Sequence, residues 1–175
     1  MVIEDYNKGL LPTSVIKEIL EIAHRAKVTT LVDPKFDNFF SYKNVSLFKP
    51  NLRELSKAIG KTLFGDKDIE AAVRDVRHRL ACQNVMVTLG KDGIALLASD
   101  DSYMTLPASV RVVNDPAGAG DTVISVMASA MAGGGKPAEA MGIANFGGGL
   151  ICEKLGIQTI TLGELESAVR RYVGV

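Results

Sequence analysis

The sequence predicts an α/β fold built on a mostly parallel sheet. In the first half, short β-branched strands alternate with amphipathic helices, the pattern of parallel sheets covered by helices. Further on, two apolar runs flank the turn Gly90-Lys91-Asp92-Gly93, which is typical of an antiparallel hairpin at the sheet edge. The last third is helical and opens with a loop of small residues, Asp115 to Asp121.

Strands are expected where β-branched or apolar runs stop at a charged residue, a proline or a glycine. They are Met1–Glu4, Val28–Val32, Val45–Phe48, Asn84–Leu89 and Ile94–Ala98, with Tyr103–Leu106 and Val110–Val113 as extensions of the antiparallel edge. Helices are expected where apolar residues recur every three or four positions. They are Ser14–Lys27, a helix from the Asn51 cap to about Ile59, Asp68–Leu80, about Ala119–Met131, Pro137–Leu155 and Leu162–Val173.

Composition narrows the class of protein. The 175 residues suffice for one domain with a core, and the 47% of hydrophobic residues excludes a disordered tail. Basic and acidic residues balance at 20 each, so we expect no nucleic-acid partner. Apolar runs are shorter than the roughly 20 residues of a membrane span, and Glu4 and Asp5 interrupt any signal peptide. Cys82 and Cys152 lack metal-ligand spacing and predict reduced thiols in a cytoplasmic protein without a membrane partner.

Polar residues directly follow several of the predicted strands. They are Asp5, Asp33, the step Lys49-Pro50-Asn51, Leu89-Gly90 and Asp115. Ligands of open α/β sheets bind at the carboxyl ends of the strands. We therefore expect a binding site on this rim.

The loop from Asn114 to Thr122 is the strongest single signal. Its glycines and alanines let a backbone approach an anion, and the helix that follows offers free N–H groups and a positive dipole end. Asp121 then stands where it can take a proton from an alcohol that attacks a phosphate. The alternative is a glycine-rich helix entry in which Asp121 only complements the helix dipole.

Three other patterns have an equally plain structural explanation. Asn51 and Glu54, three apart at a helix start, fit a helix cap with an acidic first turn. The run from Thr88 to Gly93 fits a hairpin turn. Asn145 lies on a predicted helix whose small residues fit a packing face.

The run Asp115-Pro116-Ala117-Gly118-Ala119-Gly120-Asp121-Thr122 resembles the C-terminal signature of the ribokinase-like (PfkB) carbohydrate kinases, usually Asp-Thr-x-Gly-Ala-Gly-Asp. Pro116 departs from the commoner threonine or valine and stiffens the loop. The resemblance implies a three-layer α/β/α fold and transfer of the γ-phosphoryl group of ATP to a sugar hydroxyl. It makes Asp121 the catalytic base and the amides of Ala117, Gly118, Ala119 and Gly120 the anion hole.

The same resemblance reinterprets the three other patterns. Asn51 and Glu54 match the family's Asn-x-x-Glu motif, which helps hold Mg²⁺ and its waters at the phosphates. Thr88, Gly90 and Gly93 match the Thr-Leu-Gly-x-x-Gly turn beside the nucleotide, and Asn145 matches a residue near adenine. ATP and Mg²⁺ are the cofactors that follow.

A narrower resemblance, to the heptose-7-phosphate kinase branch that starts ADP-heptose synthesis for lipopolysaccharide, covers most of the chain. It rests on Asp5-Tyr6-Asn7-Lys8-Gly9, Val32-Asp33-Pro34-Lys35, Lys49-Pro50-Asn51, and Lys154 through Leu165. It places Asp5, Lys8, Asp33 and Lys35 at the cleft, where the lysines can meet phosphates. The alternative is turn chemistry and solvated charge.

Members of this family are considerably longer. We therefore expect residues 1–175 to form a single partial domain that carries the nucleotide side and the base, without the family's first strands and β lid. We further expect weak or absent kinase activity of this chain alone, and self-association into a homo-oligomer. A non-catalytic nucleotide-binding module, or a kinase for a different sugar phosphate or a nucleoside, stays open.

Overall fold

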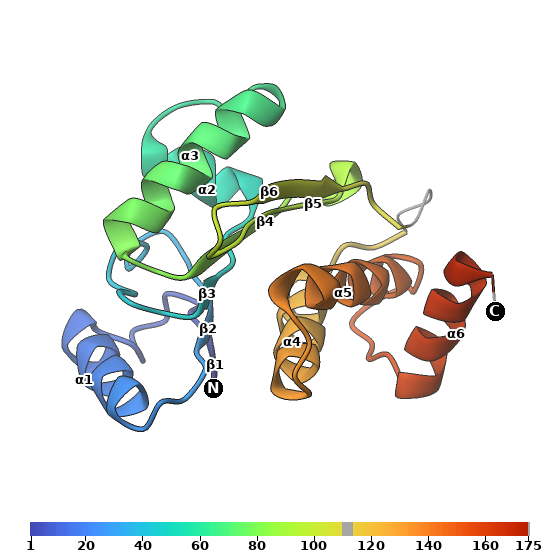
Figure 1. The fold of residues 1–175 in the computed structure, drawn as a ribbon, viewed down its shortest axis with the longest axis horizontal. Helices are drawn as coiled ribbons and strands as arrows, with labels where there is room; N and C mark the ends of the chain where they lie inside the picture. Colours follow the sequence, from blue (N-terminus) through green and yellow to red (C-terminus); the bar gives the residue numbers. More distant parts are fainter. Residues whose placement is uncertain (110–113, 175) are drawn as a thin grey trace. The chain divides into compact units, whose positions relative to one another are not determined.

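The computed structural model describes residues 1–109 and 114–174 and confirms the α/β class (Figure 1). Six strands form one sheet whose spatial order follows the sequence order. They are β1 (Val2–Glu4), β2 (Leu31–Asp33), β3 (Leu47–Phe48), β4 (Asn84–Thr88), β5 (Ile94–Leu97) and β6 (Tyr103–Leu106). The first four are parallel. The link from β4 to its neighbour β5 is too short for a parallel crossover, so the predicted hairpin is confirmed.

Six α-helices and one 3₁₀ turn occur in the described residues. They are α1 (Thr13–Arg25), α2 (Leu52–Ile59), α3 (Gly65–Leu80), η1 (Gly90–Asp92), α4 (Ala119–Ala132), α5 (Pro137–Cys152) and α6 (Leu162–Val173). All six helices were expected, with ends that differ by a few residues. The expected strand Val110–Val113 lies outside the described residues.

One strand boundary moved for a local reason. The sequence predicts a strand from Val28, but β2 begins at Leu31. Lys27 adopts a left-handed conformation with φ 54°, and the Val28 N–H donates to the Ala23 carbonyl at 2.9 Å. These residues therefore close helix α1 before the strand can start.

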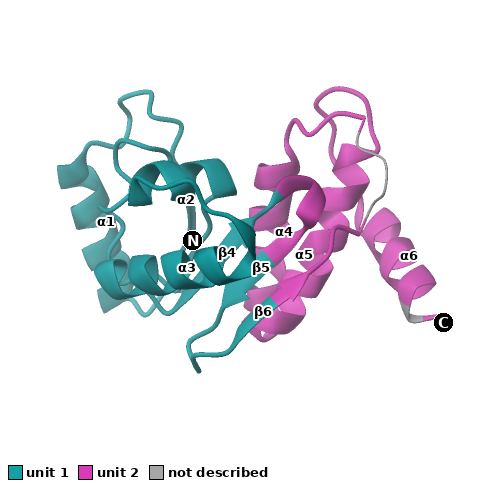
Figure 2. Ribbon diagram, turned by 90° about the horizontal axis from the view of Figure 1, so that it is seen from above, with its two compact units in different colours: residues 1–89, 95–104 teal, residues 90–94, 105–175 magenta. Residues whose placement is uncertain are grey.

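The chain forms two compact units (Figure 2). Unit 1 comprises residues 1–89 and 95–104, and unit 2 comprises residues 90–94 and 105–175.

Unit 1 holds the parallel strands and a continuous apolar core. Strands β2 and β3 are buried along their whole length, as expected for central parallel strands. In the register, Val32 pairs with Phe48 and Phe48 with Val85, so these apolar side chains continue from strand to strand. Helix α3 contributes fully buried Val73 and Val76 to the same core.

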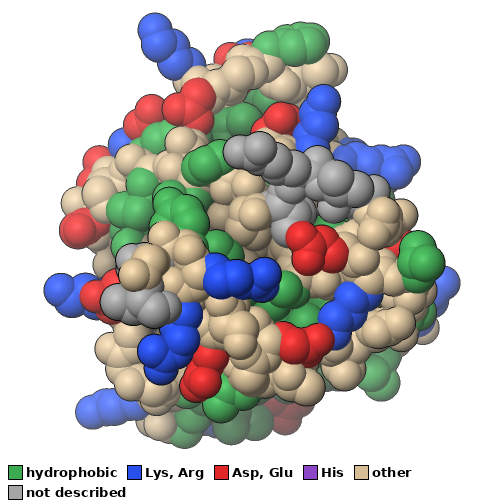
Figure 3. Space-filling view, turned by 90° about the vertical axis from the view of Figure 1, so that its right-hand side faces the viewer, with side chains coloured by type: hydrophobic (Ala, Val, Ile, Leu, Met, Phe, Trp, Pro, Cys, Tyr) green, Lys and Arg blue, Asp and Glu red, His purple; other side chains and the backbone are tan. Residues whose placement is uncertain are grey.

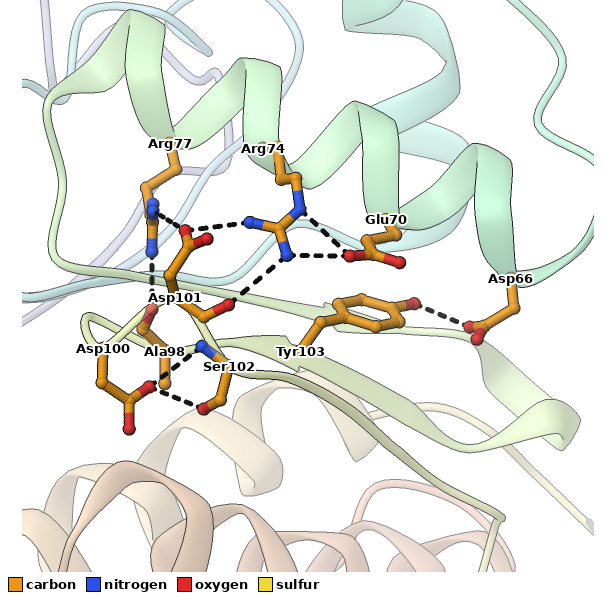
Figure 4. Close-up of polar contacts among 9 residues, drawn as sticks. All are labelled: Asp66, Glu70, Arg74, Arg77, Ala98, Asp100, Asp101, Ser102 and Tyr103. Atoms are coloured by element: carbon orange, nitrogen blue, oxygen red, sulfur yellow. Dashed lines mark hydrogen bonds and ion pairs between the residues drawn. The ribbon is translucent and has the colours of Figure 1, made fainter.

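A polar network fastens the β5–β6 turn to helix α3 (Figure 4). Arg74 and Arg77 both form ion pairs with Asp101, and the Arg77 guanidinium also donates to the Ala98 carbonyl. On the following strand, the Tyr103 hydroxyl donates to Asp66 at 2.7 Å. The antiparallel edge of unit 1 is thus tied to the helix by charge-assisted bonds.

Unit 2 is a helical layer packed through glycines. A Cβ at Gly148 of α5 would lie 2.7 Å from Cγ2 of Val123 in α4, so the two helices approach closely only because this residue has no side chain. Helix α6 packs on α5 through Phe146 and Tyr172, whose ring centroids are 5.1 Å apart.

Surface charges of both signs are interspersed on the face drawn in Figure 3. Among residues 1–109 and 114–174, none of the helices combines the length and apolarity needed to cross a bilayer.

Candidate functional site

An ion pair lies buried at the carboxyl ends of β2 and β3 in unit 1. Asp33 is the last residue of β2 and Lys49 directly follows β3, so the parallel pairing brings them side by side. Lys49 Nζ lies 2.8 Å from Asp33 Oδ2, and their side chains are only 2% and 8% exposed. A buried charge that cannot reach water needs such a partner, so each residue compensates the charge of the other.

A second ion pair joins Lys35 to the Asn51/Glu54 motif. The Asn51 side chain accepts from the Glu54 N–H at 2.8 Å, and Glu54 Oε2 accepts from the Asn51 N–H at 2.9 Å, which forms a capping box at the start of α2. Glu54 Oε1 accepts from Lys35 Nζ at 2.9 Å. Burial alone would lower the pKa of Lys35, but this hydrogen bond and the nearby Asp33 charge raise it. The motif is therefore a helix cap in this structure, as the plain explanation expects.

The cap does not exhaust the oxygens that a cation needs. Each Glu54 oxygen and the Asn51 side-chain oxygen accepts one hydrogen bond and has a second lone pair, although the Lys35 ammonium already lies at Oε1. Mg²⁺ keeps most of its waters and binds proteins through one or two oxygens. The donor set of Asn51 and Glu54 fits such an ion.

Thr88 lies next to this motif. It ends β4, pairs with Asn51 in a parallel bridge, and donates its N–H to the Pro50 carbonyl at 3.2 Å. A residue expected at the nucleotide and one expected at the metal are thus neighbours within unit 1.

Asp5 is buried and fully engaged by other residues. Its carboxylate accepts from the Tyr42 hydroxyl at 2.7 Å, from Asn38 Nδ2 at 3.0 Å and from the Asn7 N–H at 2.8 Å. Burial opposes ionisation, but these hydrogen bonds outweigh it and lower the Asp5 pKa. The same contact and burial raise the pKa of Tyr42. Asp5 therefore organises the chain after β1, whereas Lys8, three residues further along, is exposed.

Sequence reasoning missed three of these participants. Lys49 was quoted in a motif without a role, and Tyr42 and Asn38 were not singled out. A signal existed for Lys49, because Asp33 and Lys49 both end apolar parallel strands and opposite charges there predict a pair. No comparable local signal marks Tyr42 or Asn38, which lie more than thirty positions from Asp5.

In unit 2, the glycine loop opens helix α4. Gly118 is the N-cap and adopts a left-handed conformation with φ 79°. Asp115 Oδ1 accepts the Ala117 N–H at 2.9 Å, and the Pro116 carbonyl accepts the Ala119 N–H at 3.2 Å. Among residues 1–109 and 114–174, no backbone carbonyl accepts from the N–H groups of Gly118 and Gly120.

The four expected anion-hole amides of this loop have two different roles. Two of the four expected anion-hole amides hold the turn together, and the other two lie at the N-terminus of a helix, where N–H groups lack intrahelical partners. Asp121 lies in the first turn of α4 and its side chain is exposed. An anion donor pair beside an accessible carboxylate is an arrangement suited to phosphoryl transfer.

Gly93 and Asn145 both contact the segment of residues 106 and 107 in unit 2. A Cβ at Gly93 would lie 2.0 Å from the Leu106 carbonyl oxygen, so only glycine fits. Asn145 Nδ2 donates to the Pro107 carbonyl at 2.8 Å. Gly90 begins η1 with φ 62° and is exposed. Gly93 and Asn145 thus hold this segment in place by close packing and a hydrogen bond, and Gly90 supplies the left-handed conformation of the turn.

The chain is similar in sequence to known carbohydrate-kinase family proteins. A family profile described as pfkB family carbohydrate kinase matches residues 2–162. The bifunctional protein HldE of Photorhabdus laumondii is 38% identical over 170 residues, which is 97% of this chain and 35% of that protein. HldE of Rhodospirillum rubrum is 33% identical over 171 residues, 98% of this chain and 34% of that protein. The chain therefore spans about a third of the length of these relatives.

Solved structures show the same fold. Phosphofructokinase-2 from Escherichia coli in complex with substrates and products superposes with a TM-score of 0.82 at 18% identity, over 95% of this chain and 54% of that one. Arabidopsis thaliana ribokinase complexed with ribose and ATP superposes with a TM-score of 0.74 at 23% identity, over 97% and 54%. The fold is ribokinase-like, and the chain belongs to the pfkB family of carbohydrate kinases.

Proposed function

We propose that this chain carries the nucleotide side and the phosphoryl-transfer centre of an ATP-dependent sugar kinase. The observation that supports this most is the loop from Asp115 to Asp121. It offers the amides of Gly118 and Gly120 at a helix N-terminus, with an exposed carboxylate in the next turn.

In the proposed reaction, Asp121 accepts the proton of the sugar hydroxyl. The hydroxyl oxygen forms a bond to the γ-phosphorus of ATP, the bond from that phosphorus to the β,γ-bridging oxygen breaks, and ADP leaves with the electron pair. The Gly118 and Gly120 N–H groups donate to the transferring phosphoryl oxygens, and the α4 dipole stabilises their charge. Ala117 and Ala119 hold these donors in place through their own hydrogen bonds.

The other site residues take supporting parts in the proposal. Asn51 and Glu54 hold Mg²⁺ through its waters, and the ion neutralises charge on the phosphates when it is bound. The nucleotide-binding residues are Thr88, Gly90, Gly93 and Asn145; the last two act by setting the backbone of their segment.

We propose heptose 7-phosphate as the acceptor. Support comes from the HldE relatives, which match 97% or more of the chain, and from the turns after β1 and β2 that resemble the heptose-7-phosphate kinase branch. Lys8 and Lys35 supply positive charge for phosphate, and Asp33 lies beside Lys35. Asp5 positions the first of these turns.

The proposal includes the setting of the reaction. Residues 1–175 form part of one kinase domain, which acts in the cytoplasm and self-associates. Sedimentation of the purified chain tests the last point, and a clean monomer contradicts it.

The decisive experiment compares Asp121→Asn with wild type in ATP binding and in phosphorylation of heptose 7-phosphate, fructose 6-phosphate and ribose. We expect binding to survive and turnover to be lost by at least about 10²-fold, the contribution of a general base. Asp75→Asn is the matched control, because Asp75 is exposed on α3 and forms a solvent-exposed pair with Arg79 at 3.4 Å.

Equal turnover of Asp121→Asn and wild type would refute the assignment of the base. ATP binding with no turnover of any sugar by wild type would favour the non-catalytic nucleotide-binding module. Turnover confined to another sugar would reassign the acceptor.

A further inference from the structure

The two buried carboxylates at the strand ends of unit 1 have partners of different mobility. Asp33 is paired with Lys49, whose side chain is only 2% exposed and is therefore held in the core. Glu54 is paired with Lys35, whose side chain is 31% exposed while Glu54 itself is 3% exposed. The lysine can swing into solvent, whereas the carboxylate cannot follow it.

Lys35 occupies the position that a cation at Glu54 would need. Its ammonium group lies 2.9 Å from Oε1, while Oε2 is already committed to the Asn51 N–H. A hydrated Mg²⁺ that approaches the same oxygen meets a positive charge at close range, and like charges repel. Mg²⁺ and Lys35 therefore compete for Glu54.

A phosphate group is a suitable new partner for the displaced Lys35 ammonium. Once it leaves Glu54 it is an unpaired cation at the rim where the proposed function brings phosphate groups, and an ammonium–phosphate contact restores its pairing. The same movement of the Lys35 side chain therefore frees Glu54 and binds phosphate, so phosphate binding and Mg²⁺ binding favour each other.

We propose that Lys35 is a latch on the Glu54 cation site: without ligand it fills the site, and a phosphate group draws it away so that Mg²⁺ binds. This inference rests on the proposed function for the identity of the phosphate, but not for the competition between Lys35 and Mg²⁺. Lys35 is a positioning residue in this scheme, because it acts through Glu54.

The test measures Mg²⁺ binding by calorimetry on the whole chain without nucleotide, with circular dichroism to verify folding. Lys35→Met should raise Mg²⁺ affinity by roughly tenfold to a hundredfold, which corresponds to the loss of one competing charge-assisted hydrogen bond. Lys35→Gln, which keeps a polar end, serves if the methionine variant does not fold. Lys35→Arg should bind Mg²⁺ as weakly as wild type.

Two controls locate the effect. Glu54→Gln keeps the acceptor for the Asn51 N–H and should abolish the gained affinity in the Lys35→Met background. Lys61→Met removes a lysine from an exposed pair with Asp68 in the same unit and should leave affinity unchanged. Adding inorganic phosphate should raise Mg²⁺ affinity in wild type and not in Lys35→Met.

An unchanged Mg²⁺ affinity in both neutral Lys35 variants overturns the latch, as does an equal gain in Lys61→Met. These results are independent of sugar phosphorylation. A chain that phosphorylates sugars but shows no gain refutes the latch alone. A chain that shows the gain but neither binds ATP nor phosphorylates a sugar refutes the proposed function alone.

Discussion

Unit 1 should tolerate the buried charges of Asp33 and Lys49 only as long as both partners are present. Lys49→Met replaces a side chain that is 2% exposed by one of similar volume, and it leaves the 8%-exposed Asp33 carboxylate without its 2.8 Å partner. Breaking a buried pair from one side costs about 3–5 kcal/mol. Because the Lys35 charge also acts on Asp33, we expect the lower end, about 3 kcal/mol.

Removing both charges should restore most of this loss. The double variant Asp33→Asn/Lys49→Met has no uncompensated charge, and such replacements are often neutral or better. We therefore expect a coupling energy of about 2–3 kcal/mol between the two sites. Lys61→Met provides the exposed counterpart, since Lys61 and Asp68 are 61% and 31% exposed, and it should cost at most about 1 kcal/mol.

The assay is urea unfolding followed by circular dichroism, with amide hydrogen exchange of β2 and β3 to report on unit 1. A Lys49→Met variant within 1 kcal/mol of wild type, or a double variant as unstable as the sum of the single ones, would refute the reasoning.

Two further substitutions test particular contacts. Gly93→Ala places a Cβ 2.0 Å from the Leu106 carbonyl oxygen at a residue with φ 103°; clash and backbone strain together should cost about 2–6 kcal/mol and lower the melting temperature measured by calorimetry. Tyr42→Phe removes a hydrogen bond to the buried Asp5 carboxylate and should cost about 1.5–3 kcal/mol at pH 7. Because the folded-state pKa of Asp5 lies below the ordinary value of about 3.9, its stabilisation is complete above that pH and is lost as the pH falls through the folded pKa. The stability difference between wild type and Tyr42→Phe should therefore shrink in acid, and a difference that is constant from pH 7 to pH 2.5 would contradict this account.

Local signals made much of the fold predictable. The Asn51 cap, the Gly60 stop and the Gly90–Gly93 turn depend on hydrogen bonds and conformations within a few residues, and the structure has them as expected. The parallel sheet with an antiparallel hairpin at its edge followed from the alternation of strands and helices and from the later turn signal, whereas the order of the strands was not predicted. The start of β2 was wrong because the closing turn of α1 uses residues of high strand propensity.

The candidate site was predictable as a set of positions but not as a set of contacts. Asp5 was expected to face a ligand, yet its carboxylate is enclosed by groups from residues 7, 38 and 42. Gly93 was expected at the nucleotide, and the structure gives it a steric reason to be glycine. The roles of both at a ligand stay predictions.

The sequence by itself determined the α/β class, the loop from Asp115 to Asp121 at a helix start, and the family resemblance. These signals are local, because periodicity, helix caps and glycine conformations depend on residues close together in the chain. Only the tertiary structure decided which charges are paired and which are free to move. Lys49 and Lys35 look alike along the chain, since each lies within two residues of a buried strand. One is held in the core on Asp33 and the other reaches solvent from Glu54. Burial and pairing depend on strands and helices brought together from distant parts of the chain, which no local pattern records.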